Sequence, residues 1–280
     1  MFKKIMVGLL LAAAVTAFIG VYFLYSTGLL REPHYDNQAP IIPELKSPAV
    51  LVLSKTNGFV HTEAIPAAGA MLAELAVQNG WHIYQSENAA SHNAQDLARF
   101  DVVVWNNTSG DILTPTQRED FKVWLLGGGK WLGIHAAGGD PSYAWNWYVD
   151  NLLGAQFICH TMAPQFQDAN VLVVDHEEPL TMHLPSSWHV LQEEWYGFDR
   201  NPRQSGARIL LAMDESSYDT EPLLFPDSTM EGEHPIAWAR SLGKGEIIYS
   251  AIGHTAQTYA LPEYQRFIAG AINKLAGQRP

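Results

Sequence analysis

Cysteine is almost absent from this chain, in which Cys159 is the only thiol among 280 residues. A single cysteine excludes an intrachain disulfide and any zinc motif built from several thiolates. The sequence also contains no internal repeat and no His-x-x-x-His spacing, so no short motif signals a metal site. The chain is 47% hydrophobic, which allows a sizeable core in one large domain or two small ones.

Positive charge is also scarce, with 17 Lys and Arg against 29 Asp and Glu and a net charge of -12. The basic residues form no cluster along the sequence. This composition argues against a nucleic-acid partner, because nucleic-acid binding depends on a basic surface. Neutral small molecules such as sugars suit an acidic protein better, and we expect a partner of that kind.

Long apolar runs are missing except at residues 5–25, which follow Lys3 and Lys4. A helix of this length spans roughly 30 Å, the thickness of a bilayer core. The run exceeds a usual signal-peptide core, and no convincing small-residue cleavage site follows, which favours an uncleaved signal anchor over a cleaved peptide. By the positive-inside rule, residues 1–4 would stay in the cytoplasm. The body would then be periplasmic, held at the inner membrane by a single span.

Residues 26–48 contain four prolines and predict an extended linker that stands the following domain off the membrane. From Ala49 onward, apolar runs typical of buried strands alternate with helical patterns. We expect strands at residues 49–53, 81–84, 101–105, 130–134, 170–174, 207–211, 236–239 and 246–251. We expect helices at residues 63–79, 114–126 and 264–275. This alternation predicts an α/β domain over residues 49–277, with a mostly parallel sheet covered by helices on both faces.

The strand expected at residues 130–134 leads directly into His135, which two alanines and two glycines follow. Gly133 would allow a close approach, and Gly138 and Gly139 would allow a sharp or positive-φ turn. Ligands of open α/β sheets bind outside the carboxyl ends of the strands. We therefore expect a strand-to-turn elbow that holds His135 in the ligand crevice, as the nucleophile elbow of hydrolases holds its serine.

Other polar residues lie where strands end or loops begin. They are His61, His160, Glu193, Glu194, His234 and His254. Neutral imidazoles and a carboxylate can move protons near neutral pH, or they can bind zinc or a similar divalent ion.

We assign His135 as general base or metal ligand, with His61 and Glu194 as its catalytic partners. His160 and His254 are the expected metal ligands or acid–base groups. His234 and three aromatic residues, Trp105, Trp195 and Tyr196, are the expected substrate-binding side chains.

Each histidine also has a structural interpretation, because a lone histidine more often satisfies a loop than takes part in catalysis. We expect His34, His82 and His92 to be surface or linker residues, and His176, His183 and His189 to serve turn structure. Glu193 and Glu194 are adjacent, and alternate side chains of an extended segment face opposite ways. We therefore expect one of these two carboxyl groups to be solvated.

Seven stretches, in order, resemble the trehalose-utilisation (ThuA-like) family. They are Gly58–Pro66, Gly110–Pro115, Trp131–His135, Gly154–Phe157, Glu194–Tyr196, His234–Trp238 and Gly253–His254. The resemblance implies a three-layer, flavodoxin-like fold of the class I glutamine amidotransferase type. In those amidotransferases the elbow carries a cysteine. Here His135 and Ala136 occupy that part of the elbow and Cys159 lies elsewhere, so thiol-dependent glutamine hydrolysis is not expected.

The resemblance further implies a role in carbohydrate metabolism, on a sugar or a 3-keto-sugar glycoside, by hydrolase or lyase chemistry. Two alternatives stay open at this point. One is a non-catalytic carbohydrate-binding or sensory module, and the other is a tethered structural domain whose histidines merely satisfy loops. If the histidines converge in one pocket, the enzyme and the binding-module hypotheses are favoured over the structural one.

Overall fold

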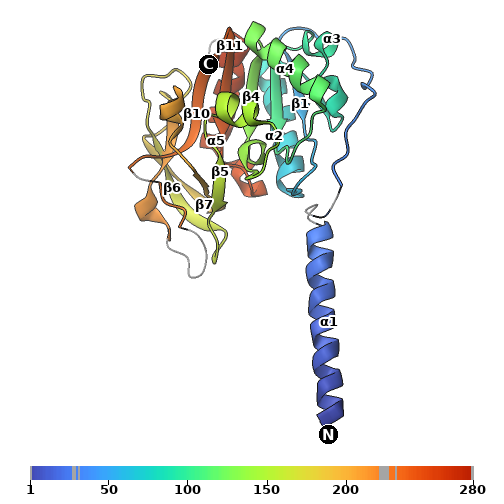
Figure 1. Cartoon of the computed structure of the whole chain (residues 1–280). Coiled ribbons are helices and arrows are strands. Elements are labelled where there is room, and N and C mark those ends of the chain that lie inside the picture. The colour runs from blue at the N-terminus through green and yellow to red at the C-terminus, as the bar shows by residue number, and fades with distance from the viewer. Residues whose placement is uncertain (1, 27–29, 31, 221–226, 231, 279–280) are drawn as a thin grey trace.

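The computed structural model describes residues 2–26, 30, 32–220, 227–230 and 232–278. The N-terminal helix α1 (Phe2–Ser26) stands apart from an α/β domain that begins at Ala49 (Figure 1). Within α1, residues 5–22 have a mean hydropathy of 2.3 and are not buried against the domain. The helix is therefore long and apolar enough to cross a bilayer, a property that a signal sequence shares.

Nine strands form one sheet in the order β2-β1-β3-β4-β11-β10-β9-β6-β7. In that order they are His82–Ser86, Ala49–Leu53, Val102–Asn106, Lys130–Ile134, Gly245–Ser250, His234–Leu242, Arg208–Met213, Gln167–Val173 and Ser187–Glu193. The first five are mutually parallel, and the last four are added by antiparallel pairing. Only β10 and β6 run against the common direction, so the expected mostly parallel sheet is confirmed.

Helices lie on both faces of this sheet (Figure 1). They are α2 (Ala64–Asn79), α3 (Ala94–Leu97), α4 (Pro115–Gly127) and α5 (Pro262–Leu275). The crossover from β1 to β2 moves along the sheet in one direction, whereas those from β2 to β3 and from β3 to β4 move in the other. Because such crossovers are right-handed, α2 covers one face and α3 and α4 the opposite face. The C-terminal helix α5 packs beside α2.

Local sequence signals explain where these elements begin and end. Strands β1 and β3 are buried at every position, as their continuous apolar runs predict. Thr114 and Gln117 form a reciprocal capping box at the start of α4, with Pro115 at the first helical position. Gly80 ends α2 in the left-handed conformation. Short helical turns complete the domain at Ala89–Ser91, His135–Gly138, Tyr148–Leu153, Pro202–Ser205, Glu215–Ser217 and Ala256–Ala260.

Three strands were not predicted: β7 and the two strands of a small antiparallel sheet, β5 (Phe157–His160) and β8 (Tyr196–Phe198). Strand β7 is an edge strand with exposed positions between its buried ones, so it has no continuous apolar run. Strands β5 and β8 have four and three residues, which is too short to produce a periodic signal.

Residues 32–48, here called the strap, are extended as expected but lie against the domain (Figure 1). The Asp36 carboxylate pairs with Lys55 at 2.9 Å and accepts the Ala89 backbone N–H at 3.0 Å. Arg99 donates to the carbonyls of Ile42 and Pro43 at 3.0 and 2.7 Å. The segment that the sequence predicts to be a stand-off linker is thus attached along one side of the sheet, because hydrogen bonds to its backbone carbonyls and a partly buried ion pair hold it there.

Candidate active site

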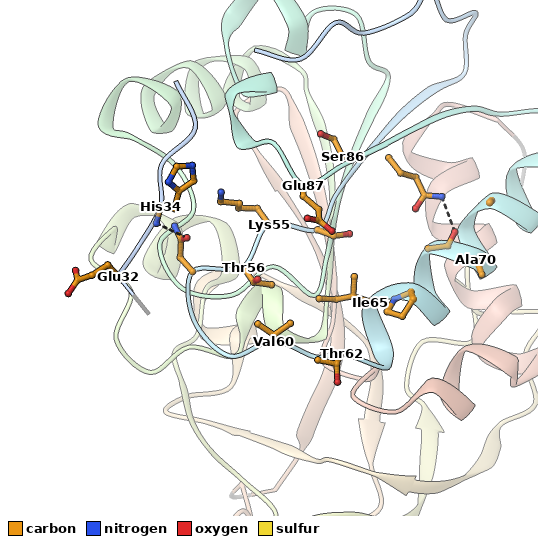
Figure 2. Close-up of a pocket in the computed structure, with 16 residues that line it drawn as sticks. Glu32, His34, Lys55, Thr56, Val60, Thr62, Ile65, Ala70, Ser86 and Glu87 are labelled. Atoms are coloured by element: carbon orange, nitrogen blue, oxygen red, sulfur yellow. Dashed lines mark hydrogen bonds between the residues drawn. The ribbon is translucent and has the colours of Figure 1, made fainter. Parts of the chain in front are cut away.

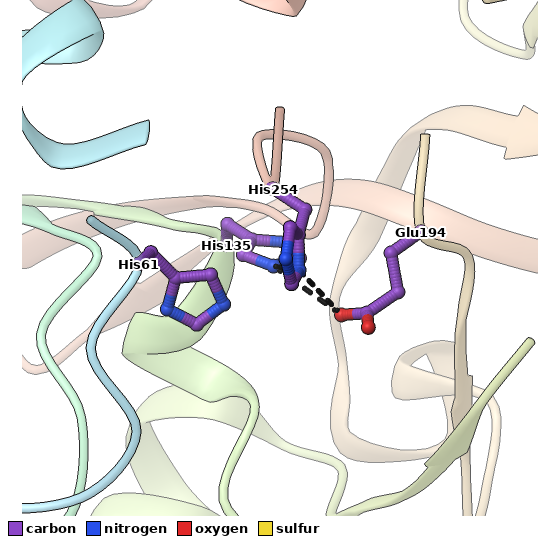
Figure 3. Close-up of side chains that lie close together, drawn as sticks. All are labelled: His61, His135, Glu194 and His254. Atoms are coloured by element: carbon purple, nitrogen blue, oxygen red, sulfur yellow. Dashed lines mark hydrogen bonds and ion pairs between the residues drawn. The ribbon is translucent and has the colours of Figure 1, made fainter. Parts of the chain in front are cut away.

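Four side chains from distant parts of the sequence converge at the carboxyl edge of the sheet. His61 lies in the loop after β1, His135 directly follows β4, His254 lies in the loop after β11, and Glu194 directly follows β7. Their ligand atoms all lie within 4.8 Å of one another (Figure 3). We call this group the histidine cluster. The strand ends bring these residues together as expected of a parallel sheet.

His135 occupies a strained position at the centre of the cluster. Its φ is +47°, a left-handed conformation that costs a non-glycine residue on the order of 1–3 kcal/mol. The ring Nδ1 lies 2.6 Å from the Ala251 carbonyl oxygen, which can only accept, so Nδ1 carries the proton. The Nε2 lone pair therefore faces the cluster, where the Tyr196 hydroxyl lies 2.9 Å away.

The two glycines after His135 act differently from the expected turn glycines. The positive φ falls on His135 itself, and Gly139 has a φ of -103°. A Cβ atom on Gly138 would lie 2.6 Å from the Tyr249 ring, and one on Gly139 would lie 2.5 Å from the Tyr196 hydroxyl. These glycines are needed for close approach of two tyrosines rather than for their own dihedral freedom.

Glu194 and His254 form the charged half of the cluster. His254 Nδ1 lies 2.9 Å from Glu194 Oε2, and His135 Nε2 lies 3.6 Å from the same oxygen. Burial acts to raise the pKa of Glu194, but the neighbouring imidazoles of His135 and His254 outweigh it and hold this pKa well below its ordinary value. Burial acts to lower the pKa of His254, but Glu194 outweighs it and raises that pKa. Without a bound cation, this pair favours a carboxylate beside a protonated imidazole.

His61 is the neutral member of the cluster. Burial, followed by the proximity of His135 and His254, lowers the pKa of His61 well below its ordinary value. Its ring meets those of His135 and His254 edge-on, with centroids 4.9 and 4.5 Å away. The His61 Nδ1 atom is buried and has no hydrogen-bond partner among the described residues. This imidazole therefore has a free polar atom inside the protein.

Glu193 and Glu194 are both buried, so the expectation that one would be solvated is wrong. Glu193 accepts from the backbone N–H of His254 at 2.9 Å and of Glu194 at 2.8 Å, and from the Thr258 hydroxyl. Alternation fails here because Gln192 has a φ of +48° and β7 ends at Glu193. Glu193 thereby anchors the loop that carries His254.

A cleft of about 590 Å³ opens above His61 and His254. Its walls include the rings of Phe59 and Phe166, the amides of Gln192 and Gln257, and the carboxylate of Glu63. Sequence analysis did not single out these wall residues. Phe59 lies within one of the family-like stretches, whereas nothing in the sequence around Phe166 connects it with the cluster. His135 is fully buried beneath the cleft and does not line it.

The two tryptophans expected to stack on a sugar lie in the core instead of the cleft. Trp105 is 3% exposed and stacks against Phe121 and Tyr148. Trp195 is 1% exposed, and its indole N–H donates to the Gln167 carbonyl at 3.0 Å. Both residues lie at or beside strand ends, but their side chains point into the core and not into the cleft.

Three further residues of the predicted site contact the cluster directly or through a neighbour: Tyr196, His234 and His160. Tyr196 is buried and contacts His135 through its hydroxyl, and its backbone carbonyl lies 2.7 Å from His234 Nε2. Both were expected to bind substrate, but neither lines the cleft. His160, expected to be a metal ligand, has its Nδ1 3.3 Å from Glu194 Oε1, the oxygen turned away from His254. It therefore lies outside the four residues of the histidine cluster.

His92, expected on the surface or in the linker, is completely buried. Its Nε2 accepts a hydrogen bond from the Trp105 indole N–H at 2.9 Å. Burial lowers the pKa of His92 to about 3, so the ring stays neutral. The prediction failed because the short turns around residue 92 fold beneath α4, which sequence periodicity does not reveal.

A larger cavity, of about 980 Å³, lies between the strap, the β1–α2 loop and α2 (Figure 2). Glu32, His34, Lys55, Ser86 and Glu87 are among the residues that line it. None of the histidine cluster lines it, and its lysine is already paired with Asp36. The smaller cleft over the cluster is therefore the better candidate for chemistry.

The fold and the cluster define an α/β protein with a three-layer architecture and a candidate site at the carboxyl edge of its sheet. The family model for trehalose utilisation (ThuA) matches residues 49–273. The chain thus belongs to the ThuA family, as the resemblance of its sequence motifs indicated. No curated protein matches the chain.

Solved structures show the same fold. A ThuA-like protein from Bacteroides uniformis is 24% identical, with a TM-score of 0.70 over 85% of this chain and 95% of that one. A ThuA-like protein from Parabacteroides merdae is 14% identical, with a TM-score of 0.59 over 84% of this chain and 92% of that one. A β-galactosidase from Bacillus circulans is 12% identical, with a TM-score of 0.55, and the match covers 85% of this chain but 32% of the enzyme.

Proposed function

We propose that this protein is an extracytoplasmic enzyme of carbohydrate metabolism, anchored to the membrane by α1, that acts on a sugar or 3-keto-sugar glycoside. The observation that carries the proposal is the histidine cluster at the floor of an aromatic and amide-lined cleft. Aromatic faces and amide groups suit the apolar faces and hydroxyl groups of a sugar. The family's link to trehalose utilisation supports the same substrate class.

The chemistry follows from the protonation states of the two cleft-lining imidazoles. A keto group makes the hydrogen on the neighbouring ring carbon acidic. Neutral His61 takes this proton, and the electron pair of the broken C–H bond moves to the carbonyl oxygen as an enolate. The enolate then collapses and expels the group on the next carbon, whose oxygen takes a proton from His254. Glu194 holds His254 in the protonated form that this step needs.

The cluster does not use the thiol chemistry of amidotransferases. Cys159 lies on β5, and its Sγ contacts the Asp227 carbonyl oxygen at 3.5 Å. Burial raises the pKa of Cys159, which disfavours the thiolate needed of a nucleophile. The imidazoles and Glu194 are therefore the groups to which we assign the reaction.

The test uses the full chain in mild detergent with a panel of glycosides and their 3-keto derivatives, followed by mass spectrometry. We expect release of the aglycone from keto-glycosides, reduced about 100-fold or more in His61→Ala and His254→Ala, since acid–base groups contribute about 10²–10⁴-fold. His82→Ala, which changes an exposed histidine on β2, serves as the matched control. Ligand-induced stabilisation without any product would instead favour the carbohydrate-binding module.

A further inference from the structure

We propose that His135, His254 and Glu194 bind a divalent transition-metal ion, Zn²⁺ in the native protein, with His61 as the fourth ligand. The proposal deepens the proposed function and rests on it for the substrate. Metal binding itself, however, is measured without any substrate. With the ion bound, His254 would be a neutral ligand, and the ion would supply the positive charge that the protonated imidazole supplies in its absence. The first three ligand atoms are His135 Nε2, His254 Nδ1 and Glu194 Oε2 (Figure 3).

These three atoms already form a triangle of metal-ligand size. His135 Nε2 lies 3.3 Å from His254 Nδ1 and 3.6 Å from Glu194 Oε2, and His254 Nδ1 lies 2.9 Å from Glu194 Oε2. Tetrahedral zinc with bonds of about 2.0–2.1 Å places neighbouring ligand atoms about 3.3 Å apart. The ion therefore needs only a small adjustment of side chains that are already in position.

The surroundings of the cluster orient its donors as a metal site requires. The Ala251 carbonyl holds the proton of His135 on Nδ1, so the Nε2 lone pair, which now accepts from the Tyr196 hydroxyl, could bind an ion instead. Complete burial keeps His135 from touching a substrate in the cleft, so a general-base role explains it less well than ligation does. His61 adds a third imidazole, whose buried Nδ1 has no partner among the described residues.

The charge balance also favours a cation. Glu193 and Glu194 are both buried beside the three imidazoles, and in all its recorded hydrogen bonds Glu193 is the acceptor. Among the described residues, no Lys or Arg forms an ion pair with either carboxylate. Buried carboxylates without a permanent cation are costly, and a divalent ion would supply the missing positive charge.

The donor types select the class of ion. Imidazole nitrogens with one carboxylate oxygen suit Zn²⁺ and neighbouring first-row divalent ions. Mg²⁺ and Ca²⁺ prefer all-oxygen sites, and Cu⁺ prefers sulfur. Two histidines and one glutamate are a known catalytic zinc set, in which a further position remains for water or substrate. Here His61 would hold the fourth position in the absence of substrate.

The experiment measures metal content of the full chain, purified in mild detergent without chelator and dialysed against metal-free buffer. We expect about one zinc per chain, and a thermal midpoint that falls when a chelator removes the ion and recovers when Zn²⁺ is restored. Mn²⁺, Fe²⁺ and Co²⁺ are added separately to the stripped protein. Zinc is expected to give the largest recovery, and a larger recovery with another ion would overturn the assignment of zinc.

Glu194→Gln keeps the shape of the side chain but removes its charge, so it is the main test variant. We expect zinc affinity, measured by competition with a chromophoric chelator, to fall about 100-fold or more in Glu194→Gln and in His254→Ala. His160→Ala changes a histidine beside the same carboxylate but outside the four ligands, and it should keep its zinc. Cobalt-substituted protein gives visible absorption bands whose loss in folded variants confirms a ligand role.

Two results would contradict the proposal. One is wild-type protein that holds no stoichiometric metal and shows no change in thermal midpoint with any of the four ions. The other is a variant lacking both Glu194 and His254 that binds zinc as tightly as the wild type. If metal-free protein still turned over keto-glycosides, the proposed function would stand but the metal would have no role in it. If the protein bound zinc but turned over no keto-glycoside, the metal site would stand and the proposed function would fail.

Discussion

Two buried histidines show how the same side chain serves different purposes within one domain. His61 lies in the cluster with a buried polar atom that has no hydrogen-bond partner among the described residues, whereas His92 accepts a hydrogen bond from the indole N–H of Trp105. Both have a lowered pKa, chiefly because burial disfavours the charged ring. Burial therefore does not distinguish a functional histidine from a structural one, but the pattern of partners does.

The pKa of His92 makes stability depend on pH. The pKa is about 3 in the folded protein and about 6.5 when unfolded, so between these values the unfolded chain binds more protons. The stability that neutral His92 contributes is complete above pH 6.5 and decreases as the pH falls towards 3. At pH 4.5 we expect a loss of roughly 2–3 kcal/mol.

Urea unfolding at pH 4.5 and 7.5 measures this effect. His92→Gln keeps an acceptor for the Trp105 indole but cannot titrate, so the difference between the two pH values should shrink by about that amount. The exposed His82→Gln should behave like the wild type. An unchanged pH dependence in His92→Gln would contradict the assignment.

At the same scale, the sequence predicted the members of the cluster better than their surroundings. His61, His135 and His254 were identifiable because each follows an expected strand at the carboxyl edge. Glu194 follows β7, which was not expected, but it lies in the family-like stretch Glu194–Tyr196. The cleft walls could not be predicted, since Phe166 reaches the site only through the fold of the added antiparallel strands. Trp105 was misplaced because an aromatic residue ending a strand looks the same whether it faces a cleft or the core.

The elements differ in how strongly their sequences define them. Strands β1, β3 and β4 consist mostly of buried apolar residues in the parallel half of the sheet, and helix α4 has explicit start signals. The edge strand β7 has neither. Local chemistry therefore specified the parallel half of the domain, whereas the added half depends on tertiary pairing that a single sequence does not reveal.

The start of α4 is a quantitative test of this local specification. Thr114→Ala removes the oxygen that accepts the Gln117 backbone N–H, and it should destabilise the domain by about 1 kcal/mol. Thr116→Ala changes an exposed threonine within the same helix and should have a much smaller effect. Equal losses in the two variants, measured by chemical unfolding, would show that the cap contributes nothing.

At the scale of the whole molecule, the strap links α1 to the domain through fixed contacts. Burial acts to raise the pKa of Asp36, but Lys55 and the Ala89 N–H outweigh it and lower that pKa, so Asp36 remains charged. Asp36→Ala would leave the largely buried Lys55 unpaired and weaken the attachment of the strap.

Trypsin reports on this attachment, because Lys46 is the only Lys or Arg in the strap. We expect cleavage after Lys46 to become several-fold faster in Asp36→Ala, since the strap detaches more often. Glu44→Gln alters an exposed strap residue and should leave the rate unchanged. A cleavage rate in Asp36→Ala equal to that of the wild type would mean that other contacts suffice.

The path of the strap determines where the N-terminal part of the chain meets the domain. His34 donates its backbone N–H to Asn57, in the loop after β1, whereas the strap ends where β1 begins. The polypeptide therefore meets the domain at the rim that holds the imidazoles, eight residues beyond Ser26. A stretch of eight residues reaches at most about 29 Å. If α1 crosses a bilayer, this short connection would keep the rim that carries the imidazoles near the membrane surface, and a sugar would reach the cleft through the aqueous layer next to the lipid headgroups.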